Sequence, residues 1–305
     1  MKFYKLYFFF LIFSFNLSVS LAQTNEDLSV ASTNVKKEKK KKSKKKKKKK
    51  YKLPDIDLTH WKVTVPIGKA KKATSVEPPE IFDYANNETL KPFMYNDSTR
   101  GAIVFHAYPA STTANTKYSR SELREQMVSG ENNVNWTFEE GGYMKAKMAI
   151  DDITRKENGK FHRVIIAQIH GRLTNEQRDR IGQKDNNAPP ILKVYWDQGK
   201  IRVKTKVLKS QNIGGDDILH KDAWDDDKGR NFEQEVGFKK FTLEVDVKDG
   251  KMVVSLNNQE FFVYDDLSIK KWNVFENYFK VGNYFQSRDK GSYAKVRLYD
   301  LEVSH

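Results

Sequence analysis

The most constraining feature of the chain is a repeated pattern of short apolar or alternating runs between Leu53 and His305. Almost no stretch keeps the period of a helix over three turns, whereas alternation of apolar and polar residues is typical of strands. Turn-forming residues at Asp197–Gly199, Asp249–Gly250 and Asn257–Asn258 separate several of the runs. About a dozen strands with few helices predict one all-β domain, a β-jelly roll built as a two-sheet sandwich. The expected strands span residues 60–66, 102–107, 117–127, 142–150, 162–170, 191–196, 200–207, 238–247, 251–256, 260–264, 277–286 and 292–303.

Two long polar insertions, 171–190 and 208–236, interrupt the strand pattern. Loops of this length in a compact domain are usually lids or binding loops. We therefore expect them to border a functional site of the domain, which spans residues 53–305.

Residues 1–22 have the pattern of a secretory signal peptide. Lys2 and Lys5 form a basic start, an uncharged apolar run follows, and Ser20 and Ala22 are small residues placed for cleavage after Ala22. The apolar run is shorter than the roughly 20 residues that a transmembrane helix needs. We expect secretion to the periplasm or the cell exterior without stable membrane insertion; an uncleaved anchor is the alternative.

A lysine-rich tract dominates the charge of the chain. Residues 36–50 comprise 13 Lys, one Glu and one Ser, so they carry +12 of the formal net charge of +15. Residues 51–305 carry only +3, which argues against nucleic acid as a partner. Residues 23–52 cannot bury enough apolar surface to offset their ordering entropy, so we expect a disordered linker. It is either a solvated spacer or an electrostatic tether for a polyanion or an anionic surface.

Charged residues alternate along the expected strand at 117–127. Side chains of a strand point to alternate faces, so Arg120, Glu122 and Arg124 share one face. Two guanidinium groups that flank one carboxylate brace each other, and their fork-shaped donors suit carboxylates. An exposed ladder of salt bridges is the alternative interpretation of this strand.

Two further strands carry polar residues on one face. In the run 162–170, Gln168 and His170 share a face next to the first long insertion. In the run 277–286, one face is mainly apolar and is expected in the core, and Gly282 on the other face is expected to leave room for a ligand. Together the three faces suit an extended, anionic, hydroxyl-rich ligand. The polar face of the last run consists of Tyr278, Lys280, Gly282, Tyr284 and Gln286.

The segments RSELRE at 120–125, QIH at 168–170 and YFKVGNYFQ at 278–286 resemble the three signature strands of the family 7 polysaccharide lyases, the alginate lyases. They occur in the order found in that family's jelly-roll domain, and the resemblance covers about residues 53–305. It implies a concave substrate cleft and cleavage of the 4-O-glycosidic bond of alginate by β-elimination.

Elimination removes the proton at C5 beside the sugar carboxylate, so fixed donors must first neutralise that carboxylate. Arg120 and Gln168 are the candidates, and the resemblance implies the same two residues. His170, which as an ordinary histidine titrates near neutral pH, suits the base, and Tyr284 suits the acid. In the family these roles belong to the matching histidine and tyrosine. The expected substrate-binding residues are Glu122, which is also expected to orient the arginines, and Arg124, Tyr278, Lys280 and Gln286.

The resemblance carries some finer expectations. The isoleucine of the QIH segment, Ile169, is associated in the family with guluronate-containing substrate, so we expect that preference. Val281 stands where the family more often has Ala, and Phe285 is a second departure. Both lie on the expected buried face, so we expect changed packing rather than lost chemistry. No metal or organic cofactor is expected, and the chain is expected to act as a monomer.

Two other classes of protein compete with this interpretation. A glycoside hydrolase on a similar jelly roll needs two carboxylates roughly 5 to 10 Å apart. The nearest match is Glu244, Asp246 and Asp249, of which the first two share a strand face and the third opens a turn, so an exposed strand is the expected interpretation. A non-catalytic carbohydrate-binding module would use the aromatic and basic residues without needing a paired histidine and tyrosine.

The cysteine, histidine and tryptophan content of the chain limits the kinds of site it can contain. The absence of cysteine excludes disulfides, thiolate metal sites and a cysteine nucleophile. The remaining histidines lack convincing metal-ligand spacing, so they are expected to be structural or exposed. The five tryptophans are expected mainly in the core, with Trp224 in the acidic loop 216–227 as a candidate for sugar contact.

Overall fold

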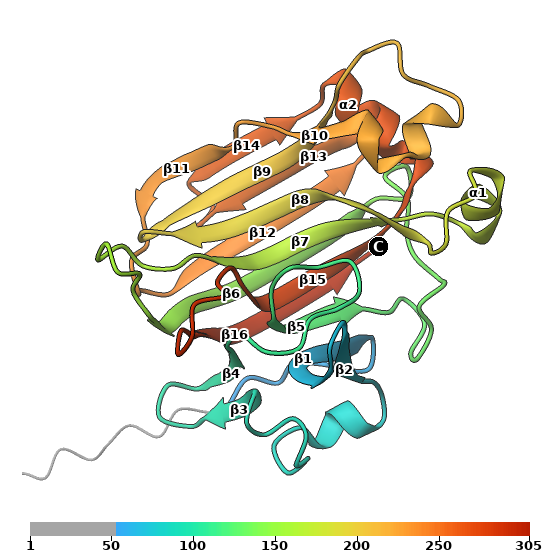
Figure 1. Cartoon of the computed structure of the whole chain (residues 1–305). Coiled ribbons are helices and arrows are strands. Elements are labelled where there is room, and N and C mark those ends of the chain that lie inside the picture. Colours follow the sequence, from blue (N-terminus) through green and yellow to red (C-terminus); the bar gives the residue numbers. More distant parts are fainter. Residues whose placement is uncertain (1–52) are drawn as a thin grey trace, which may run out of the picture. The chain divides into compact units, whose positions relative to one another are not determined.

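The computed structural model describes residues 53–305, which form two antiparallel β-sheets (Figure 1). The predicted signal peptide (1–22) and lysine-rich linker (23–52) lie outside the described residues. The first sheet has nine strands in the order β10-β9-β8-β7-β15-β5-β1-β2, and β11 also pairs with β9. Its strands are β1 (Trp61–Lys69), β2 (Lys72–Val76), β5 (Arg120–Glu125), β7 (Val164–Arg172), β8 (Asn187–Asp197), β9 (Lys200–Leu208), β10 (Trp224–Asp226), β11 (Arg230–Glu235) and β15 (Glu276–Phe285).

The second sheet has seven strands in the order β14-β13-β12-β6-β16-β4-β3. The described helices are all short, and none within residues 53–305 is long and apolar enough to cross a membrane. The strands are β3 (Met94–Asp97), β4 (Ala102–Ala107), β6 (Gly142–Ile153), β12 (Phe241–Lys248), β13 (Lys251–Leu256), β14 (Glu260–Tyr264) and β16 (Ala294–Ser304). The helices are α1 (Asn175–Arg180) and α2 (Leu267–Lys271), with 3₁₀ turns η1 (Glu80–Asp83), η2 (Asp217–Leu219), η3 (Lys221–Ala223) and η4 (Trp272–Val274).

The predicted all-β sandwich is confirmed, and every expected strand is present: β4, β13 and β14 have the expected ends, and the ends of the others are shifted. The sequence pattern missed β2, β3, β10 and β11. The first three lie at sheet edges, and β11 pairs with β9 outside the main strand order. Such strands bury less of their surface, which leaves a weak apolar pattern.

The turn residues adopt the backbone that the sequence predicted. Gln198, Asp249, Asn257 and Asn258 all have positive φ, between 51° and 54°. Left-handed backbone of this kind is tolerated best by Gly, Asn and Asp. These turns join β8 to β9, β12 to β13 and β13 to β14.

The core lies between the two sheets and contains all five tryptophans. The prediction of sugar contact for Trp224 is wrong, because its side chain is buried and only 3% exposed. Its ring packs edge-on against Trp272 with centroids 4.8 Å apart, and its Nε1 donates to the carbonyl oxygen of Ile218 at 2.8 Å. The acidic residues around Trp224 suggested an exposed loop, but this tryptophan anchors the segment to the core.

The two long insertions are more ordered than the sequence suggested. The first begins as the end of β7, contains α1 and ends as the start of β8. Thr174 caps α1 by accepting from the backbone N–H of Gln177, whose side chain bonds back to the backbone N–H of Thr174. The second insertion contains η2, η3, β10 and β11. Both insertions supply residues to the hollows described below.

Candidate active site

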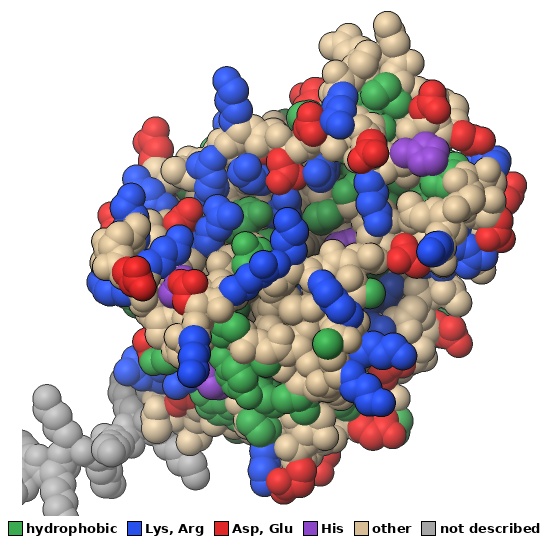
Figure 2. Space-filling view, in the orientation of Figure 1, with side chains coloured by type: hydrophobic (Ala, Val, Ile, Leu, Met, Phe, Trp, Pro, Cys, Tyr) green, Lys and Arg blue, Asp and Glu red, His purple; other side chains and the backbone are tan. Residues whose placement is uncertain are grey.

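A lateral row of polar side chains crosses one face of the nine-stranded sheet. Residues directly opposite each other on neighbouring strands share a face of the sheet. Neighbouring strands lie about 4.8 Å apart, so a row over six strands spans roughly 24 Å. Figure 2 shows Lys and Arg side chains gathered over this face. The row defined by the strand register consists of Lys62, Arg124, Lys280, Gln168, Lys193 and Lys204.

Glu122 lies beneath the centre of this row and is fully buried. Its carboxylate accepts from Arg120 Nη1 at 2.7 Å and Gln168 Nε2 at 2.7 Å, and it pairs with Lys280 Nζ at 2.6 Å. Burial raises the pKa of Glu122, but the charges of Lys280 and Arg120 outweigh it, so the pKa lies below its usual value. The carboxylate therefore stays ionised and holds two cations and an amide in fixed positions. Its burial favours an orienting role over direct contact with substrate.

Arg120 keeps donors free for a ligand. Its Nη1 donates to Glu122 and its Nε is enclosed by protein without a hydrogen-bond partner among the described residues, so Nη2 is the nitrogen left to donate to a ligand. Its guanidinium group lies 3.8 Å from the centre of the Tyr284 ring. A planar guanidinium held in this way is suited to bind a carboxylate.

His170 is held as a neutral imidazole with a defined tautomer. Its Nδ1 lies 3.0 Å from the carbonyl oxygen of Gly171. Because a carbonyl only accepts, Nδ1 carries the hydrogen and Nε2 is left as an acceptor. Burial, and then the charge of Lys280, lower the pKa of His170 to about 3. The expectation that it titrates near neutral pH is therefore wrong for the free protein.

Two tyrosines lie beside His170 and the two arginines. The ring of Tyr278 stacks on His170 with centroids 5.3 Å apart and faces Arg124, whose guanidinium lies 4.1 Å from the ring centre. Burial raises the pKa of Tyr284, against the opposing charge of Arg120. Its phenol thus keeps its proton at neutral pH and can donate it.

Arg124 differs from Arg120 in its partners. It donates to the carbonyl oxygens of Glu125 at 2.5 Å and Asn132 at 3.0 Å, and to Asn135 Oδ1 at 2.9 Å. These acceptors are neutral, and none is Glu122. The expectation that Glu122 orients both arginines therefore holds for Arg120 but not for Arg124.

Two hollows of about 630 Å³ and about 390 Å³ lie over these residues. Both are lined by Arg120 and His170, so they are two halves of one cleft. The larger half also contains Gln168, Tyr284 and Gln286. The smaller half also contains Arg124, Tyr278 and Lys280. Every predicted site residue except the buried Glu122 lines one half or the other.

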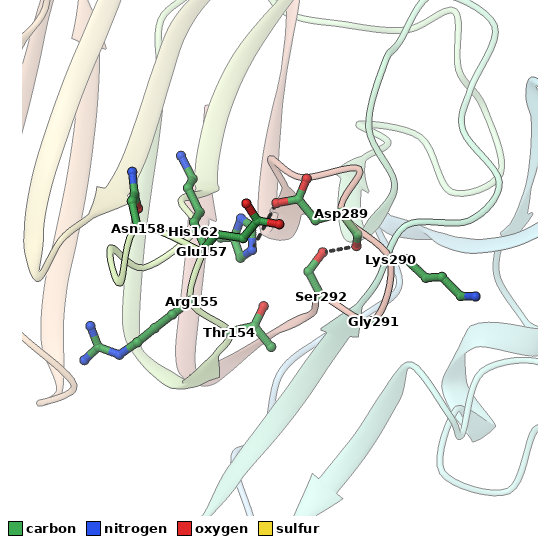
Figure 3. A pocket seen from close by; sticks show the side chains of 10 residues that line it. Thr154, Arg155, Glu157, Asn158, His162, Asp289, Lys290, Gly291 and Ser292 are labelled. Carbon is green, nitrogen blue, oxygen red and sulfur yellow. Dashed lines mark hydrogen bonds and ion pairs between the residues drawn. The ribbon is translucent and has the colours of Figure 1, made fainter.

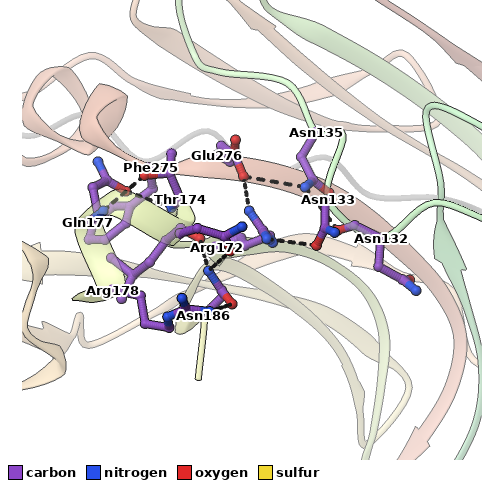
Figure 4. Close-up of polar contacts among 12 residues, drawn as sticks. Asn132, Asn133, Asn135, Arg172, Thr174, Gln177, Arg178, Asn186, Phe275 and Glu276 are labelled. Atoms are coloured by element: carbon purple, nitrogen blue, oxygen red, sulfur yellow. Dashed lines mark hydrogen bonds and ion pairs between the residues drawn. The ribbon is translucent and has the colours of Figure 1, made fainter. Parts of the chain in front are cut away.

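The cleft also contains residues that the sequence analysis missed. Arg172 is two residues beyond His170 on β7, and alternation along the strand could have found it. It pairs with Glu276 and donates to Asn133 Oδ1 at 2.9 Å, as Figure 4 shows. Nothing in the sequence pattern marks Asn133. The other missed lining residues include Lys62, Asn132 and Asn187 in the smaller half and Lys193, Tyr195, Lys206 and Lys221 in the larger half.

The prediction that Gly282 leaves room for a ligand is wrong. A side-chain carbon at Gly282 would lie 2.9 Å from the carbonyl oxygen of Ser121 and 3.5 Å from the ring of Phe105, which belongs to the core. The pairing of β15 with β7 shifts between Val281 and Tyr284, and Gly282 has φ of +135°. The glycine is therefore required by a bulge and a close backbone approach, not by the cleft.

A separate hollow of about 760 Å³ lies between the segments 154–162 and 289–292 (Figure 3). The buried His162 faces Asp289 there, with Nε2 and Oδ2 3.6 Å apart. None of the predicted site residues lines this hollow. Within residues 53–305, no group of three or more His, Asp or Glu side chains is arranged to hold a metal ion.

The carboxylates of the competing hydrolase interpretation lie elsewhere. Glu244 and Asp246 belong to β12 of the seven-stranded sheet, and Asp246 is exposed. Neither lines any of the hollows described above. They belong to a solvated face of β12 away from the hollows, so the structure gives no basis for the glycoside hydrolase interpretation.

A two-sheet jelly roll whose cleft brings a neutral histidine and a tyrosine together among cationic side chains defines a polysaccharide lyase. The family model described as alginate lyase matches residues 56–305. The chain therefore belongs to the alginate lyase family.

Solved structures agree with this assignment. The alginate lyase A1-II', described as a member of polysaccharide lyase family 7, is 28% identical with a TM-score of 0.64, over 82% of this chain and 96% of that one. A doubly substituted variant of A1-II', in complex with a substrate written GGMG, is 26% identical with a TM-score of 0.61, over 82% of this chain and 94% of that one. The alginate lyase from Corynebacterium sp. shares the fold at 24% identity, with a TM-score of 0.59, over 84% of this chain and 98% of that one. No curated protein matches the chain.

Proposed function

We propose that this lyase cleaves the 4-O-glycosidic bond of guluronate-containing alginate by β-elimination. The observation that carries the proposal is the shared lining of one hollow by Arg120, Gln168, His170 and Tyr284. The complex of A1-II' with a substrate written GGMG supports binding of a mixed oligosaccharide by this fold. Ile169 supports the guluronate preference through the family resemblance.

In the proposed mechanism, Arg120 and Gln168 bind the carboxylate of the sugar whose C5 proton is removed. Arg120 and Gln168 each have N–H groups beyond the one that they give to Glu122. These donors stabilise the negative charge that develops beside C5 in the transition state. Glu122 holds both donors in place and does not itself exchange a proton.

The proton then moves from C5 to Nε2 of His170. The electron pair forms the C4–C5 double bond, the bond between C4 and its glycosidic oxygen breaks, and Tyr284 protonates that oxygen. A pKa of about 3 makes His170 a weak base in the free protein. A bound sugar carboxylate offsets the charges of Lys280 and Arg120, two causes of that low value, so substrate binding strengthens the base.

The test is the ultraviolet absorbance of purified protein with polyguluronate, polymannuronate and a neutral β-glucan. Elimination creates a double bond conjugated to the carboxylate, whereas hydrolysis does not. We expect absorbance to rise fastest on polyguluronate, and His170→Ala and Tyr284→Phe to lower the rate roughly 10²- to 10⁴-fold. His220→Ala and Tyr108→Phe, at exposed positions outside the cleft, are the matched controls.

The same assay separates the competing classes. Release of reducing ends without absorbance would indicate a hydrolase, and binding without either signal would indicate a carbohydrate-binding module. A faster rate on polymannuronate would overturn the guluronate preference alone.

We further propose that the enzyme is secreted and that residues 23–52 are a spacer before the catalytic domain at 53–305. The signal-peptide pattern of residues 1–22 and the lysine-rich composition support this proposal. Deleting residues 23–50 should leave turnover of short oligosaccharides unchanged. Loss of that turnover would show that the tract belongs to the site.

A further inference from the structure

The larger half of the cleft extends from His170 to a group of lysines on neighbouring elements. Lys193 of β8, Lys206 of β9 and Lys221 of η3 line the same hollow as His170. By the strand register, Lys193 lies directly beside Gln168. A polyanion bound over Gln168 is therefore directed towards these lysines.

Asp226 already occupies the space between two of these lysines. Its Oδ2 lies 2.6 Å from Lys193 Nζ, and its Oδ1 lies 2.9 Å from Lys206 Nζ. The two lysine side chains are 14% and 15% exposed, whereas the Asp226 side chain is 35% exposed. One carboxylate thus engages two ammonium groups with both of its oxygens, which is how a uronate carboxylate would bind there.

The fold holds Asp226 in this position. It belongs to β10, where it pairs with Lys206, and Trp224 of the same strand pairs with Leu208. Trp224 is buried against Trp272. The strand is therefore anchored two residues before Asp226, and the carboxylate is presented by a fixed backbone.

In the other half of the cleft, Arg172 and Lys62 also have carboxylate partners, Glu276 and Glu77, but Arg124 does not. The hydrogen bonds of Arg124 go to neutral carbonyl and amide oxygens, so its charge is not cancelled by a carboxylate in direct contact. At β8 and β9, in contrast, a protein carboxylate neutralises part of the charge and repels an incoming one.

We propose that Asp226 is a specificity-determining residue whose carboxylate takes the place of a substrate carboxylate between Lys193 and Lys206. It occupies the anion-binding position between β8 and β9 and so limits how many uronate residues this half of the cleft binds. The inference rests on the proposed function and specifies the length of substrate that the site accepts.

The test compares the full chain with Asp226→Asn on guluronate trisaccharide and hexasaccharide. Loss of the charge frees two ammonium groups for a sugar carboxylate that only the longer chain brings to β9. We expect KM for the hexasaccharide to fall roughly two- to fivefold, the range of a partly exposed ion pair, with a smaller change for the trisaccharide. The fall should shrink as salt increases. Asp225→Asn is the matched control, because Asp225 neighbours Asp226 on β10 but pairs only at 3.9 Å with Lys209.

An equal change for both lengths, or weaker binding of the hexasaccharide, would overturn the proposal. Thermal unfolding of each variant separates a loss of fold from a loss of binding. Calorimetric binding of both oligosaccharides to wild type and Asp226→Asn gives the length effect without turnover. Absence of elimination on any uronate would overturn the proposed function, whereas an absent length effect in calorimetry would overturn the role of Asp226.

Discussion

Two glutamates of β5, Glu122 and Glu125, are both buried but have opposite surroundings. Glu122 faces the cleft and contacts Arg120, Lys280 and Gln168. Glu125 is 3% exposed and points to the other face of the strand. The same residue type thus serves the site on one face of the strand and the fold on the other.

None of the partners of Glu125 lines the cleft. Its Oε2 accepts from Trp136 Nε1 at 3.2 Å and from the backbone N–H of Phe279 at 2.8 Å. Its Oε1 lies 2.6 Å from Nε2 of His305. Glu122 is surrounded by cations that also line the cleft, so it positions donors for a ligand. Glu125 receives an indole, a backbone N–H and the imidazole of His305, so it holds separate segments of the fold together.

The largest expected effect is on activity, at Glu122. Glu122→Gln keeps the shape of the side chain but removes the charge that holds Arg120 and Lys280 close together. We expect kcat/KM for polyguluronate to fall about 10²-fold, the usual cost of disturbing fixed transition-state donors. Absorbance assays measure the rate, and circular dichroism checks the fold. Glu244→Gln on the opposite sheet is the control. A near-normal rate for Glu122→Gln would contradict the role of Glu122 in the site and so remove its difference from Glu125.

Glu125→Gln should act on stability instead. The amide oxygen can still accept from Trp136 and Phe279, but the amide has no charge, so the charge-assisted bond to a protonated His305 and the charge on the other two bonds are lost. We expect the free energy of unfolding to fall by about 2 to 3 kcal/mol, with nearly normal turnover per folded molecule. Urea unfolding with parallel rate measurements tests this. A large loss of kcat in fully folded protein would place Glu125 in the site.

The pH dependence of activity should sharpen the comparison. Burial, and then the charge of Arg120, lower the pKa of Lys280 to about 8, while Glu122 opposes the shift. As pH rises through about 8, Lys280 loses its charge and kcat/KM should fall by at most about tenfold per pH unit. In Glu122→Gln this decline should begin at a lower pH, because the opposing carboxylate is gone. If the fall of kcat/KM with pH is the same in Glu122→Gln as in the wild type, a group other than Lys280 causes it.

The smallest expected effect is at His305. Burial lowers its pKa, but the hydrogen bond and charge of Glu125 outweigh burial, so the pKa is raised. A raised histidine pKa stabilises the fold fully below the ordinary value, and the stabilisation is lost as pH rises through the folded-state value. His305→Ala should therefore cost about 1 kcal/mol near pH 5 and less near pH 9. Urea unfolding at both pH values tests the sign.

Alternation along single strands predicted much of the site. Arg120, Glu122, Gln168 and His170 come from two strands that are not neighbours in sequence, yet their shared faces could be assigned from a period of two. The same rule extended by two residues would have found Arg172. It failed at Gly282, because the bulge in β15 changes the alternation that the rule assumes.

The sequence by itself determined the fold class, the faces of the strands and the types of residue that face a ligand. Those properties depend on local alternation and on side-chain chemistry. Only the tertiary structure decided which charges meet. The low pKa of His170 arises from groups on different strands, and so do the ion pairs of Asp226 with Lys193 and Lys206. Burial and Coulomb interactions depend on distances in space, and a sequence specifies these only after strand order and register are formed.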